Sequence, residues 1–451
     1  MNFNDDFQSM TLVEITKFFI EYGEGLTRNK RSCKGCSDDE LFLINFIRVI
    51  NANSSGRDFL QKIHDGVIDG LPRVKRASYF DAIKSKRRLA YVKDVSDGIY
   101  KLMERIIREK DEIDYLADIP ELLNRQVFAA DGHSITHAVH DNKIKEKYPC
   151  MTEIYSMNLR TGLLTPMAIL ADENSSKPNE IRYLKKEISK HAKKYGGTRP
   201  LYIYDRAIID FKFLTITTRE DSILIITRAK ISMKPIIKEP LEYDELDPIN
   251  EGITGYYLIG LNNAGTLYQV DYIDPETKQE YSFITNDSSL RPGTVAYLYR
   301  IRWKIEKTFD VLKNKLFEKK AWGTSATAKE MQANIIASSY NLMLFFEHII
   351  KKDIDGKLKT EKKREESLKA REKVVKIKNL EKEKKEKPKN FKSRKELILN
   401  REFKIPNHEF LLPHIYQITQ QFIRGVRNWL ARKVALKQML PILKERLKCY
   451  I

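Results

Sequence analysis

Cysteine is scarce in this sequence. The 451 residues include four cysteines, Cys33, Cys36, Cys150 and Cys449, which are too few for a disulfide framework in a chain of this length. A reducing compartment is therefore expected. The pair in "CKGC" has the spacing of a zinc knuckle, but no second CxxC and no nearby His pair completes four ligands. We therefore expect no structural zinc there.

Long hydrophobic runs are also missing. No apolar stretch approaches the roughly 20 residues that a membrane-spanning helix requires. The N-terminus, "MNFNDDFQSM", carries acids where a signal peptide carries bases followed by an apolar stretch. No internal repeat recurs at a fixed period. These absences predict a soluble, intracellular protein that makes no contact with a membrane.

Acidic residues are in the minority. Lys and Arg number 81 against 62 Asp and Glu, so the net charge of +19 favours polyanionic partners. A basic stretch with interleaved aromatics, "GLPRVKRASYFDAIKSKRR", is typical of a small helical DNA-binding unit, although a solvated basic helix with its aromatics in the core explains it equally well. Its candidate DNA contacts are Arg73, Lys75, Arg76, Lys86, Arg87 and Arg88.

The hydrophobic periodicity changes along the chain. It has the period of a helix up to about residue 120 and then turns into short strand-like runs mixed with helices, which predicts a mixed α/β fold. The charged stretch at 351–400 has 20 Lys or Arg and 10 Asp or Glu. The predicted segments are a helical domain at 1–120, the first part of an α/β core at 121–230, a β-rich insertion at 231–290, the second part of the core at 291–350, a charged linker at 351–400 and a C-terminal helical cap at 401–451.

Two acids follow apolar strands in the predicted core. Asp131 ends "VFAAD" and Asp205 ends "LYIYD", and an Asp at the end of a strand points into the crevice where α/β sheets carry their chemistry. Two rival acids are Asp172, after an equally apolar run, and Asp210, one helical turn past Asp205. We favour Asp205 because it directly ends its strand.

The helical stretch "YLYRIRWKIEKTFDVLKNKL" carries a polar row along the border of its apolar face. At 100° per residue, Tyr299, Arg302, Glu306 and Lys313 fall within an arc of about 60°. By itself this row indicates a surface seam, in which Arg302 and Glu306 form an i,i+4 ion pair worth about 0.3–0.5 kcal/mol.

Together with the two strand-end acids, however, Glu306 makes a set of three carboxylates. Three such charges can share a site only when cations neutralise them, and Mg²⁺ prefers carboxylates, waters and phosphate oxygens as ligands. Two Mg²⁺ ions could activate a water or a 3′-hydroxyl and stabilise the leaving oxygen of a phosphodiester. The pattern therefore predicts phosphoryl transfer on nucleic acid, with Arg302 and Lys313 on the phosphates and Tyr299 on a sugar or phosphate.

These residues resemble a known family. The spacing of Tyr299, Arg302, Glu306 and Lys313 matches the Y-R-E-K signature of bacterial insertion-sequence transposases of the DDE type. Trp303 after Arg302, "FAADGHSI", "YIYDRAII", "RASYFDAIKSKRR" and the downstream "KKAWGTSATAKEMQANIIASSYNLML" are also similar to this family. The resemblance covers about residues 70–350.

The resemblance implies an RNase H-like core with a β-rich insertion before the catalytic Glu. Asp131, Asp205 and Glu306 would bind two Mg²⁺ ions, for which Mn²⁺ is an expected substitute, and no small-molecule cofactor is implied. The implied partners are double-stranded transposon ends and target DNA, bound by a homodimer in a synaptic complex in a prokaryotic cytoplasm, associated with the nucleoid. Trp303 and the basic N-terminal residues would contact DNA.

Several alternatives stay open at this point. The chain could be an RNase H-like nuclease or resolvase without strand transfer, or an inactive DNA-binding derivative of a transposase. His133, where the family more often has a small hydroxyl residue, could be a DNA contact or a packing residue. Hairpin intermediates are likewise undecided, because the insertion contains no Trp.

Overall fold

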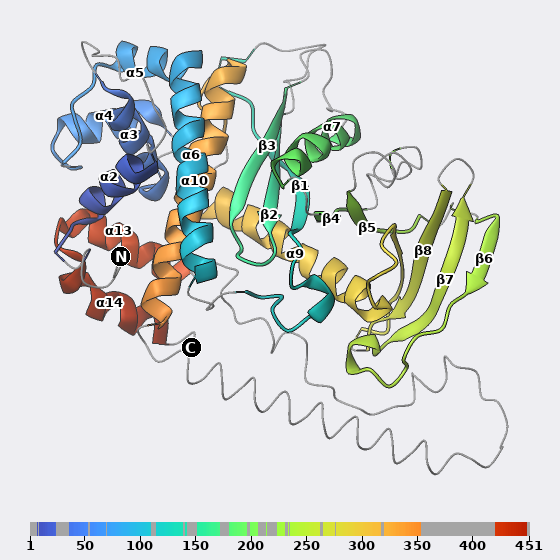
Figure 1. Ribbon diagram of the computed structural model, residues 1–451. Coiled ribbons are helices and arrows are strands. Elements are labelled where there is room, and N and C mark those ends of the chain that lie inside the picture. The colour runs from blue at the N-terminus through green and yellow to red at the C-terminus, as the bar shows by residue number, and fades with distance from the viewer. Residues whose placement is uncertain are drawn as a thin grey trace.

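The structure is a computed structural model of the whole chain (Figure 1). It describes residues from Phe7 to Lys448 with gaps, the longest of which are 24–35, 142–150, 172–179, 206–212, 214–222 and 353–419. The predicted charged linker at 351–400 lies outside the described residues, except for the last two residues of a helix. Asp172, Asp210 and Cys33 also lie outside them.

The N-terminal part is helical, as the periodicity predicts. Helix α3 begins with a capping box in which the Ser37 side chain accepts from the Glu40 backbone N–H and the Glu40 side chain accepts from that of Ser37. The N-terminal helices form one bundle with α10 and two C-terminal helices, on the left of Figure 1. The helices concerned are α2 (Leu12–Gly23), α3 (Asp38–Ile50), α4 (Gly56–His64), α5 (Arg76–Ala82), α6 (Lys86–Glu109), α10 (Ala326–Lys352), α13 (Gln420–Arg432) and α14 (Leu436–Lys448).

No helix in the described parts of the chain is long and apolar enough to cross a membrane.

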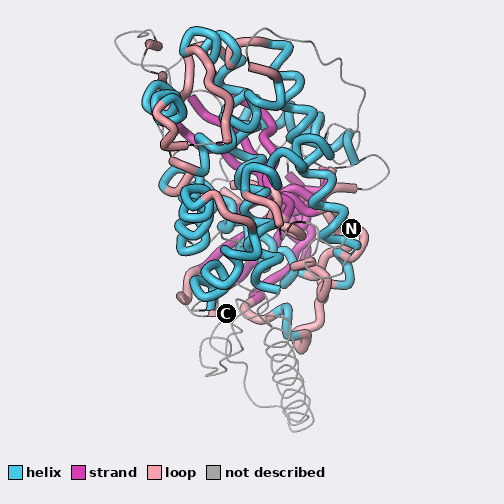
Figure 2. Tube along the Cα trace, turned by 90° about the vertical axis from the view of Figure 1, so that its left-hand side faces the viewer, coloured by secondary structure: helices cyan, strands magenta, loops and turns pink. Residues whose placement is uncertain are grey.

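Beside the bundle, the described residues form one nine-stranded sheet, in the order β3-β2-β1-β4-β5-β9-β8-β7-β6, with further helices packed on it. The pairs β1–β4 and β4–β5 are parallel, and all other neighbours are antiparallel. Figure 2 shows the strands lying among helices. The strands are β1 (Val127–Ile135), β2 (Met151–Asn158), β3 (Leu164–Ala171), β4 (Leu201–Ile203), β5 (Leu224–Arg228), β6 (Ile237–Pro240), β7 (Ile253–Leu261), β8 (Gly265–Ile273) and β9 (Glu280–Thr285).

Alternate residues of the central strands face two different cores. In β1, Val127 and Ala129 belong to the large core shared with α9 (Pro292–Asn314) and α10, whereas Phe128 and Ala130 belong to a smaller core shared with α7 (Glu180–Ala192). This alternation follows from the period of two in a strand. The sheet therefore has helices on both faces, and the parity of a residue decides which helix it meets.

The predicted fold class is confirmed: the protein has a mixed α/β sheet with flanking helices and helical N- and C-terminal parts. Two local features differ from the expectation. β1 does not end at Asp131 but continues to Ile135, because the antiparallel partner β2 pairs with it along that whole length. In addition, β6 to β9, which arise from the predicted insertion, extend the core sheet through the pairing of β5 with β9.

The first turn of α9 is fixed by close packing against the short 3₁₀ helix η4 (Pro248–Asn250). Pro292 occupies the first turn, where its missing N–H costs nothing, and the Gly293 N–H donates to Asn250 Oδ1 at 2.8 Å. Arg291 donates to Glu121 and Asp247 at 2.7–2.9 Å. A Cβ atom on Gly293 would lie 1.8 Å from the Ile249 carbonyl oxygen, so the approach requires glycine.

We expect Gly293→Ala to lower the free energy of unfolding by about 2–3 kcal/mol, because backbone atoms cannot move aside as a side chain can. The measurement is the urea midpoint, together with hydrogen exchange of the first turn of α9, which should lose protection. Gly323→Ala is the matched control, since its Cβ would lie 3.1 Å from the Ala328 Cβ, and it should cost much less. Equal midpoints for the two variants would contradict this account of the packing.

Candidate active site

Three carboxylates converge on the face of the sheet that α9 covers. Asp131 has the same parity as Val127 and Ala129 in β1, and Asp205, two residues past the end of β4, has the same parity as Ile203. Glu306 comes from α9, which contacts β1, β4 and β5. The charges of Glu306 and Asp205 both act on the titration of Asp131, so the three carboxylates belong to one electrostatic site.

Asp131 has both carboxylate oxygens engaged. Oδ1 accepts the Gly132 N–H at 2.8 Å, and Oδ2 accepts from Arg302 Nη1 at 3.2 Å. Burial raises the pKa of Asp131 to about 6, and repulsion from Glu306 and Asp205 adds to this, while Arg302 and the Gly132 N–H oppose it. Burial is the largest of these effects, and Arg302 faces three carboxylates, so their combined negative charge exceeds the positive charge of this one cation.

Arg302 lies between two of the three acids. Its Nη1 donates to Asp131, and its Nη2 donates to Glu306 Oε1 at 2.8 Å. The Arg302 side chain is only 6% exposed, and the neighbouring carboxylates raise its pKa although burial opposes this. The i,i+4 pair predicted from the helix is thus present, but it is a buried bridge from α9 to β1 and not a surface seam.

Tyr299 contacts the third acid, Asp205. Its hydroxyl donates to Asp205 Oδ1 at 3.2 Å, and burial raises its pKa to about 12. The ring packs on Phe283 of β9, with centroids 4.8 Å apart, and the Arg302 guanidinium lies 5.3 Å from the ring centroid. Residues of the Y-R-E-K row therefore contact all three acids from a single helix.

Trp303 and Lys313 face solvent. Trp303 is 55% exposed although it is large and apolar, and Lys313 is exposed in the last turn of α9. Both are accessible to a partner. The exposure of a tryptophan beside buried charge is what a contact surface for another molecule requires.

The donor set suits a hard divalent cation, because it consists of carboxylate oxygens with excess negative charge. Within the described ranges, however, no group of three or more His, Cys, Asp or Glu side chains is arranged to hold a metal ion. In the arrangement observed, Arg302 lies between Asp131 and Glu306, and the Tyr299 hydroxyl donates to an oxygen of Asp205.

His133 is a packing residue between β1 and α9. It is 4% exposed, and its ring lies 5.0 Å from that of Phe309, one turn after Glu306 on α9. Directly opposite His133 in the β1–β2 register lies Glu153, a fully buried acid that accepts a hydrogen bond from Tyr155 at 2.6 Å. Sequence reasoning missed Glu153; the available signal was an acid with core-facing parity in "TEIYS".

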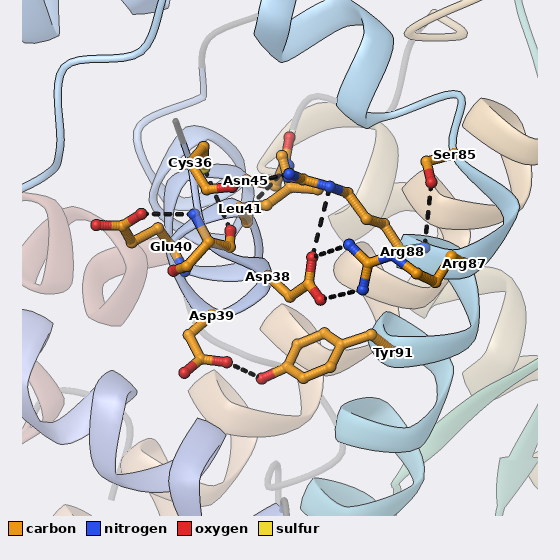
Figure 3. A network of polar contacts seen from close by, with 11 residues as sticks. Cys36, Asp38, Asp39, Glu40, Leu41, Asn45, Ser85, Arg87, Arg88 and Tyr91 are labelled. Atoms are coloured by element: carbon orange, nitrogen blue, oxygen red, sulfur yellow. Dashed lines mark hydrogen bonds and ion pairs between the residues drawn. The ribbon is translucent and has the colours of Figure 1, made fainter. Parts of the chain in front are cut away.

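The basic N-terminal residues divide into two groups. Arg73, Lys75, Arg76 and Lys86 are exposed, as a phosphate-binding surface requires. The remaining two make contacts within the helical bundle (Figure 3): Arg87, which is also exposed, donates to Asp38 at 2.9 Å, and Arg88 donates to the Cys36 carbonyl at 2.8 Å. Arg87 and Arg88 thus join the start of α6 to the start of α3.

Cys36, the described member of the "CKGC" pair, is buried, and burial raises its pKa to about 12. Such a thiol is a poor metal ligand, because a metal binds the thiolate.

Comparison with known proteins gives two findings. Residues 123–342 match the family model described as "Transposase DDE domain", a range that contains Asp131, Asp205 and Glu306. A solved structure titled "Cryo-EM structure of piggyBac transposase synaptic complex with hairpin DNA (SNHP)" is similar at 12% sequence identity and a TM-score of 0.37, with 78% of this chain and 74% of that chain covered. No curated protein matches the chain. At residues 123–342 the chain is therefore similar to the transposase DDE domain family.

Proposed function

We propose that the protein is a DDE transposase that cleaves DNA at transposon ends and joins those ends to target DNA. The observation that carries this proposal is the convergence of Asp131, Asp205 and Glu306 from two strands and one helix within the family's domain. Excess negative charge in a half-buried site suits a reaction in which cations and phosphates meet.

The three carboxylates would hold two Mg²⁺ ions, and Mn²⁺ should substitute. When bound, the metal would supply Lewis-acid stabilisation of the phosphodiester and activate the attacking oxygen. Arg302 and Lys313 would bind phosphates, Tyr299 would fix Asp205 while contacting the sugar-phosphate backbone, and Trp303 would pack against the nucleic acid.

Recognition of the transposon ends is proposed for the helical domain at 1–120. Its exposed cations, Arg73, Lys75, Arg76 and Lys86, would neutralise phosphates and fix the register of the duplex. We also propose that two protomers pair two ends in a synaptic complex, in a prokaryotic cytoplasm and associated with the nucleoid.

An RNase H-like nuclease or resolvase would use the same carboxylates without strand transfer. The two functions differ in one measurable product, because a transposase joins the 3′ end of its cleaved substrate to a second duplex. A DNA-binding derivative without activity would give neither cleavage nor joining.

We expect Glu306→Gln to reduce the rate of Mg²⁺-dependent strand cleavage by roughly a thousandfold, because several kcal/mol of transition-state stabilisation depend on the metal. Binding of a duplex that carries the inverted repeat flanking the coding sequence should persist. Asp310→Asn, an exposed acid on the same helix, is the matched control and should cleave normally. Undiminished cleavage by Glu306→Gln would refute the assignment of the site.

Removal of Lys313 should weaken DNA binding at every sequence alike. Lys313→Ala is expected to reduce the salt dependence of the binding constant by about one unit of slope, because one phosphate contact is lost. The neutral neighbour Asn314→Ala should leave the slope unchanged. The same slope for both variants would mean that Lys313 makes no phosphate contact.

Within the basic N-terminal cluster, Arg76 and Arg88 should respond differently to substitution. Arg76→Ala should lower DNA affinity and the salt slope with little effect on the thermal midpoint, because its side chain is exposed. Arg88→Ala should lower the thermal midpoint, because it leaves the Cys36 carbonyl without its partner and removes one of the two arginines that pair with Asp38. Thermal melts and salt titrations of both variants give the comparison, and equal losses of stability would contradict it.

A further inference from the structure

We propose that Arg302 occupies the metal-binding carboxylates when DNA is absent, and that DNA phosphates draw it away, so that metal loading depends on bound DNA. This proposal rests on the function proposed above and adds a form of regulation to the same site.

The two terminal nitrogens of Arg302 contact Asp131 Oδ2 at 3.2 Å and Glu306 Oε1 at 2.8 Å, so the guanidinium bridges two of the three proposed ligands. The remaining oxygen of Asp131 accepts the Gly132 N–H at 2.8 Å. A divalent ion that joined these two acids would need the place that the guanidinium now fills.

A guanidinium and a divalent cation repel each other strongly in a partly buried site, where the effective dielectric constant is well below that of water. The Arg302 side chain is 6% exposed, so water screens this repulsion little. Metal binding in the absence of DNA must therefore either displace Arg302 or bear its repulsion, and both lower the affinity.

DNA phosphates offer the Arg302 guanidinium an alternative partner to the carboxylates. A guanidinium binds a phosphate through two parallel N–H bonds, and DNA presents phosphates in a row. The Nε atom of Arg302 has no hydrogen-bond partner among the residues that the structure describes, so part of its donor fork is unused in this arrangement. Its neighbour Trp303 and the nearby Lys307 are exposed and mark the side from which DNA would approach.

A reciprocal consequence follows. If DNA favours the arrangement in which Arg302 has left the carboxylates, then metal favours DNA binding by the same factor, because coupling between two ligands is symmetric. Such a coupling would keep the chain from cleaving phosphodiester bonds before a DNA end is engaged.

The competing role for Arg302 is to hold the carboxylates in position for the metal. The two roles make opposite predictions for a neutral substitution. If Arg302 competes with the metal, its removal tightens metal binding by the DNA-free protein. If Arg302 positions the ligands, its removal weakens that binding.

The test is calorimetric titration of Mn²⁺ into the full-length protein without DNA, comparing the wild type with Arg302→Met. We expect the variant to bind Mn²⁺ about tenfold more tightly or better, which is within the usual range of coupling between sites. Arg302→Gln retains a hydrogen-bond donor without the charge and should change the affinity in the same direction, which covers the case in which Arg302→Met fails to fold. Unchanged or weaker Mn²⁺ binding by the folded variants would overturn the proposal.

Two controls separate charge from position. Lys307→Met removes an exposed cation one residue after Glu306 and should leave the Mn²⁺ affinity within about twofold, since an exposed charge is screened. Adding Glu306→Gln to Arg302→Met should abolish the tightened binding, which assigns it to these carboxylates. An equal gain in Lys307→Met would attribute the effect to net charge and would also overturn the proposal.

A second titration includes a duplex carrying the inverted repeat that flanks the coding sequence. Wild-type protein should bind Mn²⁺ more tightly with this duplex than without it, and Arg302→Met should lose most of that difference. If wild type binds Mn²⁺ tightly without DNA and the duplex adds nothing, this inference fails while the proposed function stands. If neither protein binds Mn²⁺ at these carboxylates under any condition, the proposed function itself fails.

Discussion

The mutual repulsion of three carboxylates at one place on the sheet is the constraint on which the rest of the site depends. Asp131 is partly buried, its pKa is raised by burial and by its acidic neighbours, and a nearby cation stabilises its carboxylate form. Arg302 supplies that cation from α9, and the same contact joins the helix to β1. Electrostatic balance and helix placement are thus a single requirement.

Much of this site could be predicted from the sequence because it depends on periodicity. The row of Tyr299, Arg302 and Glu306 follows from 100° per residue, and Asp131 and Asp205 are proposed because each directly follows an apolar run. The sheet core and the helical ends could be predicted for the same reason.

The remaining features depend on partners that are distant in sequence. β1 runs past Asp131 because β2 pairs with it there, and no local signal shows where that pairing stops. Arg87 and Arg88 have the composition of DNA contacts, yet Asp38 and the Cys36 carbonyl bind them across about 50 residues. The burial of Arg302 likewise depends on where α9 crosses the sheet, which only the packing determines.

The insertion is structurally part of the site. Because β9 pairs with β5 and its Phe283 packs on Tyr299, the strands before α9 support the hydroxyl that binds Asp205. A change of length or twist in these strands would therefore be transmitted to the carboxylates. It follows that this region cannot be exchanged as a separate module between related proteins: a chimera that keeps all three acids but takes its insertion from elsewhere would also need the matching aromatic contact.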